Sequence, residues 1–508
     1  MPTAQTQTIT DVPMLVAGQW RASTAERFTN VYNPSTGQVI ARTPLCSSEE
    51  TSQVVESAAA ALPQWSNTPV VERARVMFAV RELMQRHFDD LAALITREHG
   101  KTLGESRAEV QRGLEMVEFA CGIPSLLMGQ NMPDIATEVD AELLRHAVGV
   151  CVGITPYNFP NMVPLWMIPV AITCGNTFVH KPLEKVPLSA VRIGELLVEA
   201  GLPDGVFNIV HGDRACVETL LTHPRVSAVS FVGSTPVAQH VYQTATHAGK
   251  RVQSSGGAKN HLIVMPDADI DLAVKGLAAS AYGCAGQRCM AGSVAVTVGD
   301  AADPIVESLR DLASHMRVGP TDGCDDVDMG PLIRREHVDR VAGYMDVAAG
   351  DGADVVLDGR REFDGDGFLL GPCIIDRVET SMRIWREEIF GPVLSVVRAA
   401  DLDTALAIGD QCEYGNGATI FTNSGHAARQ FKQHFNAGMI GINVGVPAPM
   451  AWFPFTGWNR SFFGDLHTQG AEAIQFYTRS KTVLTRWFKS PDASHHDPVW
   501  KSQGAGKN

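Results

Sequence analysis

The sequence predicts an α/β protein with doubly wound parallel sheets, because strand-like and helix-like segments alternate along most of the chain. One alternating run extends from Ala147 to Met265, and a second extends from Asp267 to about Asn443. At 508 residues the chain is too long for one hydrophobic core, so two or three domains are expected. Its 45% hydrophobic and 19% charged residues are ordinary values for a globular enzyme.

The N-terminal part is predicted to contain short strands and then helices. Turn signals such as Asn33-Pro34 and Thr36-Gly37 punctuate the chain up to about Thr43, which indicates short strands. Helices are predicted from Ser47 onward, over Val70–His99 and over Gly104–Ala120.

The two alternating runs supply the strands of the expected sheets. In the first run, strands are predicted at Ala147–Ile154, Thr177–His180, Val206–Ile209, Val226–Val232 and His261–Met265, with helices at Ser189–Ala200 and Val237–Ala248. In the second run, a helix is predicted at Asp267–Ala281 and strands at Ser293–Val298, Val393–Val397, Ala418–Phe421 and Met439–Ile442. Thr482–Phe488 is predicted to form a further strand, and the chain from Pro491 a frayed tail.

Composition and charge argue against several classes of function. The net charge is −14 and no basic block is present, so neither nucleic acid nor a membrane surface is an expected partner. The most apolar segment, Met162–Cys174, has 13 residues and two prolines, whereas a membrane span needs about 20 apolar residues. The sequence therefore favours a soluble protein that acts on small molecules.

The cysteines and the first residues indicate a cytoplasmic protein. Ten cysteines are scattered singly, with no Cys-x-x-Cys pair and no Cys/His cluster, which argues against a disulfide framework and against a metal site. Reduced thiols suit the cytosol. Met1–Trp20 contains no lysine, no arginine and no continuous apolar run, so we expect neither a signal peptide nor a transit peptide.

The segment Gly283–Gly292 is a candidate catalytic loop. It contains two cysteines among small residues, and Cys289 directly follows Arg288. An exposed thiol beside a fixed positive charge is suited to nucleophilic catalysis, because the cation stabilises the thiolate. The alternative, a buried and inert cysteine, stays open on these residues alone. The loop lies where the first alternating run meets the second, a position expected to face an interdomain cleft.

Two further segments could bind a nucleotide, although neither common glycine fingerprint is present. Phe231–Pro236 reads as a strand end followed by a capped helix N-terminus, where a pyrophosphate could rest. Lys181 and Glu184 follow a predicted strand and could grip ribose hydroxyls. An ordinary strand-to-helix connection and a solvated turn are the respective alternatives.

Five short motifs occur in a set order along the chain, at 155–160 (Thr-Pro-Tyr-Asn-Phe-Pro), Lys181-Pro182, Phe231–Ser234, Cys289 and 388–392 (Glu-Ile-Phe-Gly-Pro). Together they resemble the NAD(P)-dependent aldehyde dehydrogenase superfamily over nearly the whole chain. The resemblance implies the aldehyde dehydrogenase fold, with a Rossmann-like NAD-binding domain and a second α/β catalytic domain. The expected divisions are an NAD-binding domain at 1–260, a catalytic domain at 261–450 and a return segment with an oligomerisation strand and tail at 451–508. Residues of about 130–150 are expected to contribute to a small β oligomerisation element.

The resemblance also implies roles for individual residues. Cys289 is the expected nucleophile, and Asn158 is the expected side-chain donor to the oxyanion. The expected NAD-binding residues are Thr155, Tyr157, Lys181, Glu184, Lys185, Gly233, Ser234, Glu388 and Phe390. Of these, Lys181 and Glu184 hold the adenosine ribose, Ser234 the pyrophosphate and Glu388 the nicotinamide ribose. A carboxylate at Glu184 favours NAD over NADP, because it repels a 2′-phosphate.

Within the superfamily, three features resemble the CoA-acylating methylmalonate-semialdehyde and malonate-semialdehyde dehydrogenases. Ser255 stands where hydrolytic members carry the glutamate that activates water, and Gly257–His261 matches the subfamily. Arg112 and Arg288 match arginines that hold the substrate carboxylate, although Arg112 could instead be a surface residue paired with Glu109 or Glu115. The aromatic run at 453–465 is similar as well, and Phe455 is an expected substrate-binding residue.

The activity implied by this resemblance is oxidation of methylmalonate or malonate semialdehyde with NAD, transfer to CoA and loss of carbon dioxide. The products would be propionyl-CoA or acetyl-CoA, in the breakdown of valine, inositol or β-alanine. The main alternative is a hydrolytic aldehyde dehydrogenase for another small semialdehyde, with Glu387 or a water chain as the base. A catalytically silent binding protein is a third hypothesis. The resemblance also implies a cytoplasmic homo-oligomer, either a dimer or a tetramer.

Overall fold

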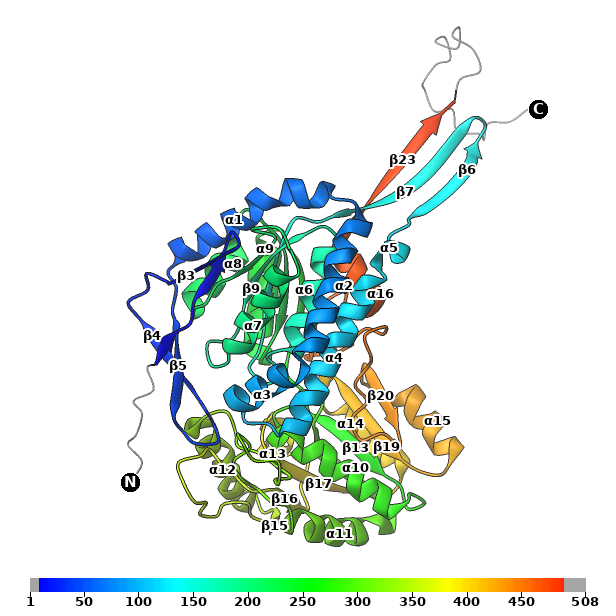
Figure 1. Ribbon diagram of the computed structural model, residues 1–508. Helices are drawn as coiled ribbons and strands as arrows, with labels where there is room; N and C mark the ends of the chain where they lie inside the picture. The colour runs from blue at the N-terminus through cyan, green and yellow to red at the C-terminus, as the bar shows by residue number, and fades with distance from the viewer. Residues whose placement is uncertain (1–8, 488–508) are drawn as a thin grey trace, which may run out of the picture.

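A computed structural model describes residues 9–487 (Figure 1). Its first sheet has five parallel strands in the order β12-β11-β8-β9-β10. These strands are β8 (Val150–Ile154), β9 (Thr177–Lys181), β10 (Phe207–Ile209), β11 (Val226–Val232) and β12 (Arg251–Ser255). The strand order reverses between β8 and β11, which makes this point the topological switch of a doubly wound sheet. The predicted fold class is confirmed.

Antiparallel strands extend the first sheet at both edges. On one edge β22 (Phe462–Gly464) pairs with β12, so the C-terminal part of the chain returns to this sheet. On the other edge β2 (Met14–Val16) and β3 (Gln19–Arg21) follow β10. A small separate sheet is formed by β1 (Thr10–Asp11), β5 (Val39–Pro44) and β4 (Phe28–Tyr32).

The second sheet has six parallel strands and one antiparallel edge strand, in the order β15-β16-β17-β14-β13-β19-β20. Its strands are β13 (Asn260–Val264), β14 (Gly292–Val298), β15 (Asp354–Leu357), β16 (Cys373–Asp376), β17 (Val393–Ala399), β19 (Gly417–Phe421) and β20 (Met439–Ile442). Its inner strands are almost wholly buried, as expected for a sheet covered on both faces. Between the two sheets, β12 ends at Ser255 and β13 begins at Asn260, close to the predicted division at 260. The domain boundaries themselves stay predictions.

Helices cover the sheets (Figure 1). Around the first sheet lie α1 (Ser48–Asn67), α2 (Val70–Arg86), α3 (Phe88–His99), α4 (Leu103–Cys121), α6 (Met162–Thr173), α7 (Leu188–Glu199), α8 (Arg214–Thr222) and α9 (Thr235–His247). Beyond Asn260 come α10 (Ile270–Tyr282), α11 (Ala302–Ser314), α12 (Arg335–Gly350), α14 (Leu402–Asp410), α15 (Gly425–His434) and α16 (Gly470–Phe476). Short elements complete the chain: α5 (Ile123–Leu126), α13 (Arg383–Arg386), β18 (Tyr414–Gly415) and β21 (Trp458–Asn459).

The predicted helix over Val70–His99 is two helices rather than one. The break is at His87, whose backbone leaves helical geometry with φ −102° and ψ 22°. No glycine or proline marks this position, so no helix-breaking residue indicates the end of α2. The break lets Met84 at the end of α2 and Leu91 in α3 enter the same core. The expectation of a single helix was therefore wrong.

Two elements in and around the first sheet, β12 and α6, are not predicted by the sequence pattern. The strand β12 contains Gln253, Ser254 and Ser255, which are poor strand signals, yet all three are buried. Gln253 donates to the Ser230 hydroxyl (2.7 Å) and Ser254 to the Ala238 carbonyl (2.9 Å), so these two buried donors are paired. The helix α6 is apolar on all sides and lies buried against α4, which removes the amphipathic period that would reveal it.

The predicted strand Ala147–Ile154 is divided between two elements. The strand β7 (Val139–Ala147) ends where a turn at Gly149, with φ +139°, leads into β8. Together β6 (Gln130–Ala136), β7 and β23 (Thr478–Arg486) form a three-stranded sheet that projects from the body as an arm (Figure 1). The predicted strand Thr482–Phe488 corresponds to β23, although Phe488 and the tail from Pro491 lie outside the described residues. That this arm is an oligomerisation element stays a prediction. Among residues 9–487, no helix is long and apolar enough to cross a bilayer.

Tyr477 ties the base of the arm to the first sheet, which gives a test of this junction. Its buried hydroxyl lies 2.7 Å from the Ser230 hydroxyl and 3.4 Å from Gln253 Nε2. We expect Tyr477→Phe to lower the free energy of unfolding by about 1–3 kcal/mol, because buried polar groups lose a partner. Urea denaturation measures the change. Tyr242→Phe is the control, since the described residues supply no hydrogen bond to its hydroxyl; an equal loss in both variants would contradict the assignment.

Candidate active site

Cys289 lies on the loop between α10 and β14, three residues after a strained turn. The turn comprises Gly283–Gly286, and its residues Cys284 and Ala285 both have φ +52°. Such left-handed geometry is unfavourable for residues with a side chain. At Gly286, with φ +70°, a Cβ atom would lie 2.1 Å from the Gly391 carbonyl oxygen, so only glycine permits this contact. The turn therefore packs directly on the segment that follows Glu388.

Hydrogen bonds from several elements fix this turn. The Glu105 carboxylate, at the N-terminus of α4, accepts from the Cys284 backbone N–H (2.6 Å). The Cys289 carbonyl accepts from the side chains of Asn260 (2.8 Å) and Asn416 (2.9 Å). No short motif pointed to Glu105 or Asn416 in the sequence, and the match of Gly257–His261 gave Asn260 no role of its own. Each is contributed by a segment distant from Cys289, so only the fold brings them together.

Asn158 comes to the same turn from the first sheet. It lies on the loop after β8, is buried, and donates from Nδ2 to the Gln287 carbonyl (3.0 Å). An amide group has two N–H donors, so one remains available for a ligand. The structure thus brings Asn158 and the Cys289 loop together, as expected from the sequence.

Cys289 stands at the junction of two cavities. One is a cleft of about 1440 Å³ along the first sheet, and the other is a cavity of about 880 Å³ beneath α4. Their linings share two residues, Cys289 and Phe159. A ligand in either cavity can therefore reach the same sulfur atom.

The protonation of Cys289 differs from the expectation based on Arg288. Burial first, and then the charge of the nearby Glu388 carboxylate, raise the pKa of the Cys289 thiol to about 12. Arg288 lowers this pKa only weakly, because its guanidinium donates to the Ala279 carbonyl. The thiol is half-buried rather than exposed. The expectation that Arg288 makes a resting thiolate was therefore wrong, and burial is the reason.

The cleft along the first sheet has the form of a dinucleotide site. It lies at the carboxyl ends of β8, β9 and β11, at the switch point of the sheet. At its floor the N-terminus of α9 begins at Ser234, whose side chain makes no capping bond, so backbone N–H groups there are free for a phosphate. The buried Tyr157 hydroxyl in the same cleft has no partner among the described residues. These features fit NAD.

Most of the predicted cofactor residues line this cleft: Thr155, Tyr157, Lys181, Lys185, Gly233, Ser234, Glu388 and Phe390. Glu184 is the exception. Its carboxylate lies behind Lys181, with Oε2 3.3 Å from Lys181 Nζ.

Glu388 and Phe390 are held by residues that the sequence did not reveal. The Glu388 carboxylate accepts from the Ala258 backbone N–H (2.8 Å), and burial raises its pKa to about 7. On α12, His337 donates to the Phe390 carbonyl (2.7 Å) and Arg340 to the Ile389 carbonyl (2.6 Å). These two bonds hold Phe390 in a left-handed conformation, with φ +57°. Both α12 side chains also line the cleft.

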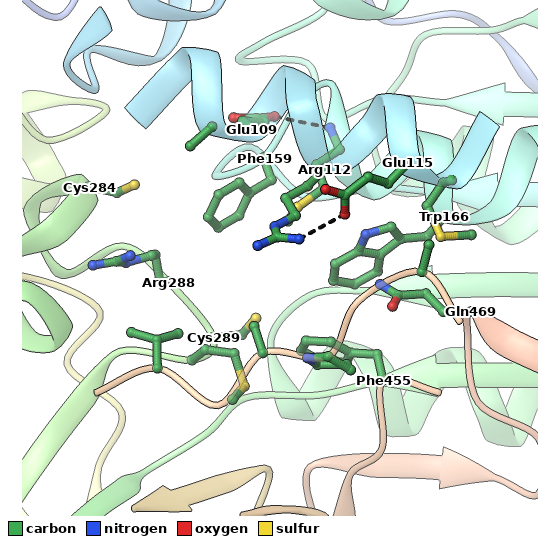
Figure 2. A pocket seen from close by; sticks show the side chains of 18 of the residues that line it. Glu109, Arg112, Glu115, Phe159, Trp166, Cys284, Arg288, Cys289, Phe455 and Gln469 are labelled. Atoms are coloured by element: carbon green, nitrogen blue, oxygen red, sulfur yellow. Dashed lines mark hydrogen bonds and ion pairs between the residues drawn. The ribbon is translucent and has the colours of Figure 1, made fainter. Parts of the chain in front are cut away.

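The second cavity contains the three predicted substrate residues, Arg112, Arg288 and Phe455 (Figure 2). Arg112 extends from α4 and pairs with Glu115 (2.8 Å), one of the two partners expected if it were a surface residue. Its side chain nevertheless lines the cavity. The Phe455 ring packs on Trp166, with centroids 4.7 Å apart. Arg288 Nε is buried with no hydrogen-bond partner in the described part of the chain, which leaves a donor free for an anionic ligand.

Neither Ser255, which stands in place of the hydrolytic glutamate, nor Glu387, the proposed replacement base, lines the cleft or the cavity. Ser255 is the buried last residue of β12 and lines neither the cleft nor the cavity. Glu387 binds Arg383 (2.8 Å) and the Tyr344 hydroxyl (2.5 Å), in a different pocket from Cys289. Within residues 9–487, no group of three or more His, Cys, Asp or Glu side chains could hold a metal ion.

Comparisons with known proteins agree with this geometry. Residues 20–483 match the family model described as the aldehyde dehydrogenase family. Malonate-semialdehyde dehydrogenase 3 of Geobacillus kaustophilus (strain HTA426) is 52% identical over 93% of this chain and 98% of its own. The crystal structure of methylmalonate-semialdehyde dehydrogenase from Oceanimonas doudoroffii has a TM-score of 0.93 and 48% identity, covering 95% and 99% of the two chains. A Sinorhizobium meliloti 1021 structure described by the same activity, complexed with NAD, has a TM-score of 0.93 and 43% identity, with coverage of 95% and 99%.

The raised pKa of Cys289 predicts how alkylation of the protein without cofactor depends on pH. Because only the thiolate reacts, the rate should rise about tenfold per pH unit between pH 7 and 9, without a plateau. Labelling with iodoacetamide is quenched at set times, and mass spectrometry of the Cys289 peptide then measures this rate. Cys289→Ser gives the background from the other half-buried thiols, Cys121 and Cys324. A plateau near pH 8 would contradict the assignment.

Proposed function

The chain belongs to the aldehyde dehydrogenase family, and from this membership we propose that it converts malonate or methylmalonate semialdehyde to acetyl-CoA or propionyl-CoA. NAD is the proposed oxidant. The observation that carries the proposal is the position of Cys289 between a dinucleotide cleft and a cavity that contains two arginines. The names of the relatives given above support this substrate class.

In the proposed first step, the Cys289 thiolate attacks the aldehyde carbon. The resulting alkoxide accepts hydrogen bonds from the free Asn158 N–H and from the Cys289 backbone N–H, in a site of low polarity where such bonds are strong. Bound NAD supplies the hydride acceptor. Loss of hydride from the former aldehyde carbon leaves a thioester on Cys289, and the proton released from the thiol goes to solvent or to a neighbouring base.

A CoA thiol is the proposed acceptor of the acyl group. Ser255 carries no carboxylate, and Glu387 faces a different pocket, so neither supplies a base beside the thioester. Glu388 is the carboxylate that lines the cleft with Cys289, and it is held by the Ala258 N–H. We propose that Glu388, engaged by this backbone N–H, does not activate water, so that the thioester persists long enough for another thiol to attack its carbonyl carbon. Cys289 then leaves as the thiolate.

Arg112 and Arg288 are the proposed ligands of the substrate carboxylate. Both line the cavity, and planar guanidinium groups bind carboxylates through paired hydrogen bonds. Once the aldehyde has become a thioester, its carbonyl stands β to the carboxylate, which makes loss of carbon dioxide chemically easy. Phe455 forms an apolar wall for the short carbon chain.

The remaining assignments are proposals of the same kind. We assign the nine cofactor residues, including Glu184 at the ribose end, to NAD on the family motifs and on the shape of the cleft.

The arm of β6, β7 and β23 leaves large apolar side chains exposed, among them Met132, Leu484 and Trp487, which supports its assignment to a homo-oligomer contact. A cytoplasmic location is proposed from the ten free cysteines, the described ones being unpaired.

CoA dependence tests the proposed reaction. We expect one equivalent of NADH to form rapidly from malonate semialdehyde without CoA, and sustained turnover only after CoA is added. NADH absorbance and acetyl-CoA chromatography measure the two phases. Full turnover without CoA, with release of the free acid, would favour the hydrolytic alternative. Cys289→Ala should form no NADH, and an unchanged rate in that variant would refute catalysis by this thiol.

Substrate discrimination tests the role of Arg112. We expect Arg112→Ala to lower kcat/KM for malonate semialdehyde about 10- to 100-fold, because a charge-assisted bond to the carboxylate is lost. Propanal has no carboxylate, so its kcat/KM should stay within a few-fold of the wild-type value. Arg310→Ala, a charge deletion on α11 outside both cavities, is the matched control. Equal losses with the two aldehydes would contradict carboxylate binding by Arg112.

A further inference from the structure

A buried ion pair lies at the edge of the second cavity, whose lining includes its carboxylate residue, Glu109. Lys101 Nζ and Glu109 Oε2 are 2.6 Å apart, and both side chains have 0% exposure. Taking two charges fully out of water is costly, so such a pair needs further hydrogen bonds in order to persist. Lys101 itself lines neither cavity, and no motif drew attention to it in the sequence.

The remaining hydrogen-bonding capacity of the pair is directed at one short segment, 158–162. Lys101 Nζ also donates to the Asn158 carbonyl (2.7 Å) and lies 3.9 Å from the centroid of the Phe159 ring. The other carboxylate oxygen of Glu109 accepts from the backbone N–H groups of Asn161 (2.8 Å) and Met162 (3.1 Å). Both ends of the segment that carries Asn158 are therefore attached to one buried ion pair.

Glu109 also completes the start of α6. The N-cap residue Asn161 makes no side-chain capping bond, and the Glu109 carboxylate takes over that function. Glu109 lies on α4, the same helix that holds the Cys284 N–H through Glu105 and carries Arg112 into the second cavity. One helix thus connects the Asn158 segment to the cysteine turn.

We propose that Lys101 and Glu109 are positioning residues for the oxyanion donor. They fix the main chain at Asn158, so that its amide group stays aligned with the sulfur of Cys289 while it bonds to the Gln287 carbonyl. Through Phe159, the same pair fixes the wall shared by both cavities. This inference rests on the proposed function, because it presumes that Asn158 stabilises the alkoxide.

The test combines a neutral replacement of the pair with deletion of the donor. Lys101→Met/Glu109→Gln removes both charges and retains an acceptor for the Asn161 and Met162 N–H groups. Single-turnover NADH formation is measured for the wild type, this double variant, Asn158→Ala and the triple variant. We expect the double variant to react about 10²-fold more slowly, with the NAD Kd unchanged. Asn158→Ala should cost about 10²–10³ in the wild type but less than about fivefold in the double variant.

The decisive result is that the rate losses of the double variant and of Asn158→Ala do not multiply in the triple variant, because a merely structural role would not produce this outcome. An unchanged rate in the double variant, or an equal cost of Asn158→Ala in both backgrounds, would overturn the inference. If Asn158→Ala alone leaves the rate unchanged, the oxyanion role in the proposed function fails instead. If the double variant does not fold, Glu109→Gln takes its place in the same set of four rate measurements. This substitution keeps the shape of the side chain and its acceptor.

Lys250 provides a matched control for loss of a buried amine. Its Nζ donates to the carbonyls of His223 (2.6 Å) and Val226 (2.9 Å), and none of these three residues lines either cavity. Lys250→Met should lower the Tm and leave the single-turnover rate unchanged. A slower single turnover in Lys250→Met, matching that of the double variant, would mean that general destabilisation explains both and would overturn the inference.

Discussion

The carbonyl oxygen of Cys289 accepts two asparagine side chains, one at the start of β13 and one just before β19. From the opposite sheet, Asn158 donates to the carbonyl two residues earlier. These bonds hold a turn with consecutive left-handed residues, each of which costs about 1–3 kcal/mol. Since a net hydrogen bond contributes about 1 kcal/mol, several are needed to offset that strain. The placement of the sulfur therefore depends on how the two sheets pack together.

Burial has opposite effects on the two stages of the chemistry. It disfavours charge on the resting thiol and on Glu388, whose pKa values both rise. The same exclusion of water strengthens every hydrogen bond that Asn158 can offer to an alkoxide. A site built in this way is a poor nucleophile until substrate arrives, and it stabilises charge well once the alkoxide forms. Charged groups exposed to solvent could not both keep the resting thiol protonated and stabilise the alkoxide strongly.

Sequence patterns predicted the fold class, and they singled out residues that the structure brings together at the candidate site better than they singled out the supports. Cys289, Asn158 and Glu388 stand in short contiguous motifs, so the sequence was sufficient to single them out. Lys101 is 8 residues from Glu109 and 57 residues from Asn158 along the chain, and only the tertiary structure reveals such partners. The polar strand β12 and the break at His87 were missed because buried hydrogen bonds and shared core contacts outweigh local propensity there. Arg288 was found, but its effect on the thiol was not, because desolvation is a property of the folded chain.

The two cavities that meet at Cys289 share only Phe159 besides the cysteine itself. The walls of the dinucleotide cleft come from the first sheet and α12, whereas those of the other cavity come from α4 and the segment around 446–469. Changes that alter preference for the aldehyde can accumulate in one wall without disturbing the other. Laboratory evolution of aldehyde specificity therefore has a bounded set of positions to vary, namely those that line the second cavity and not the cleft.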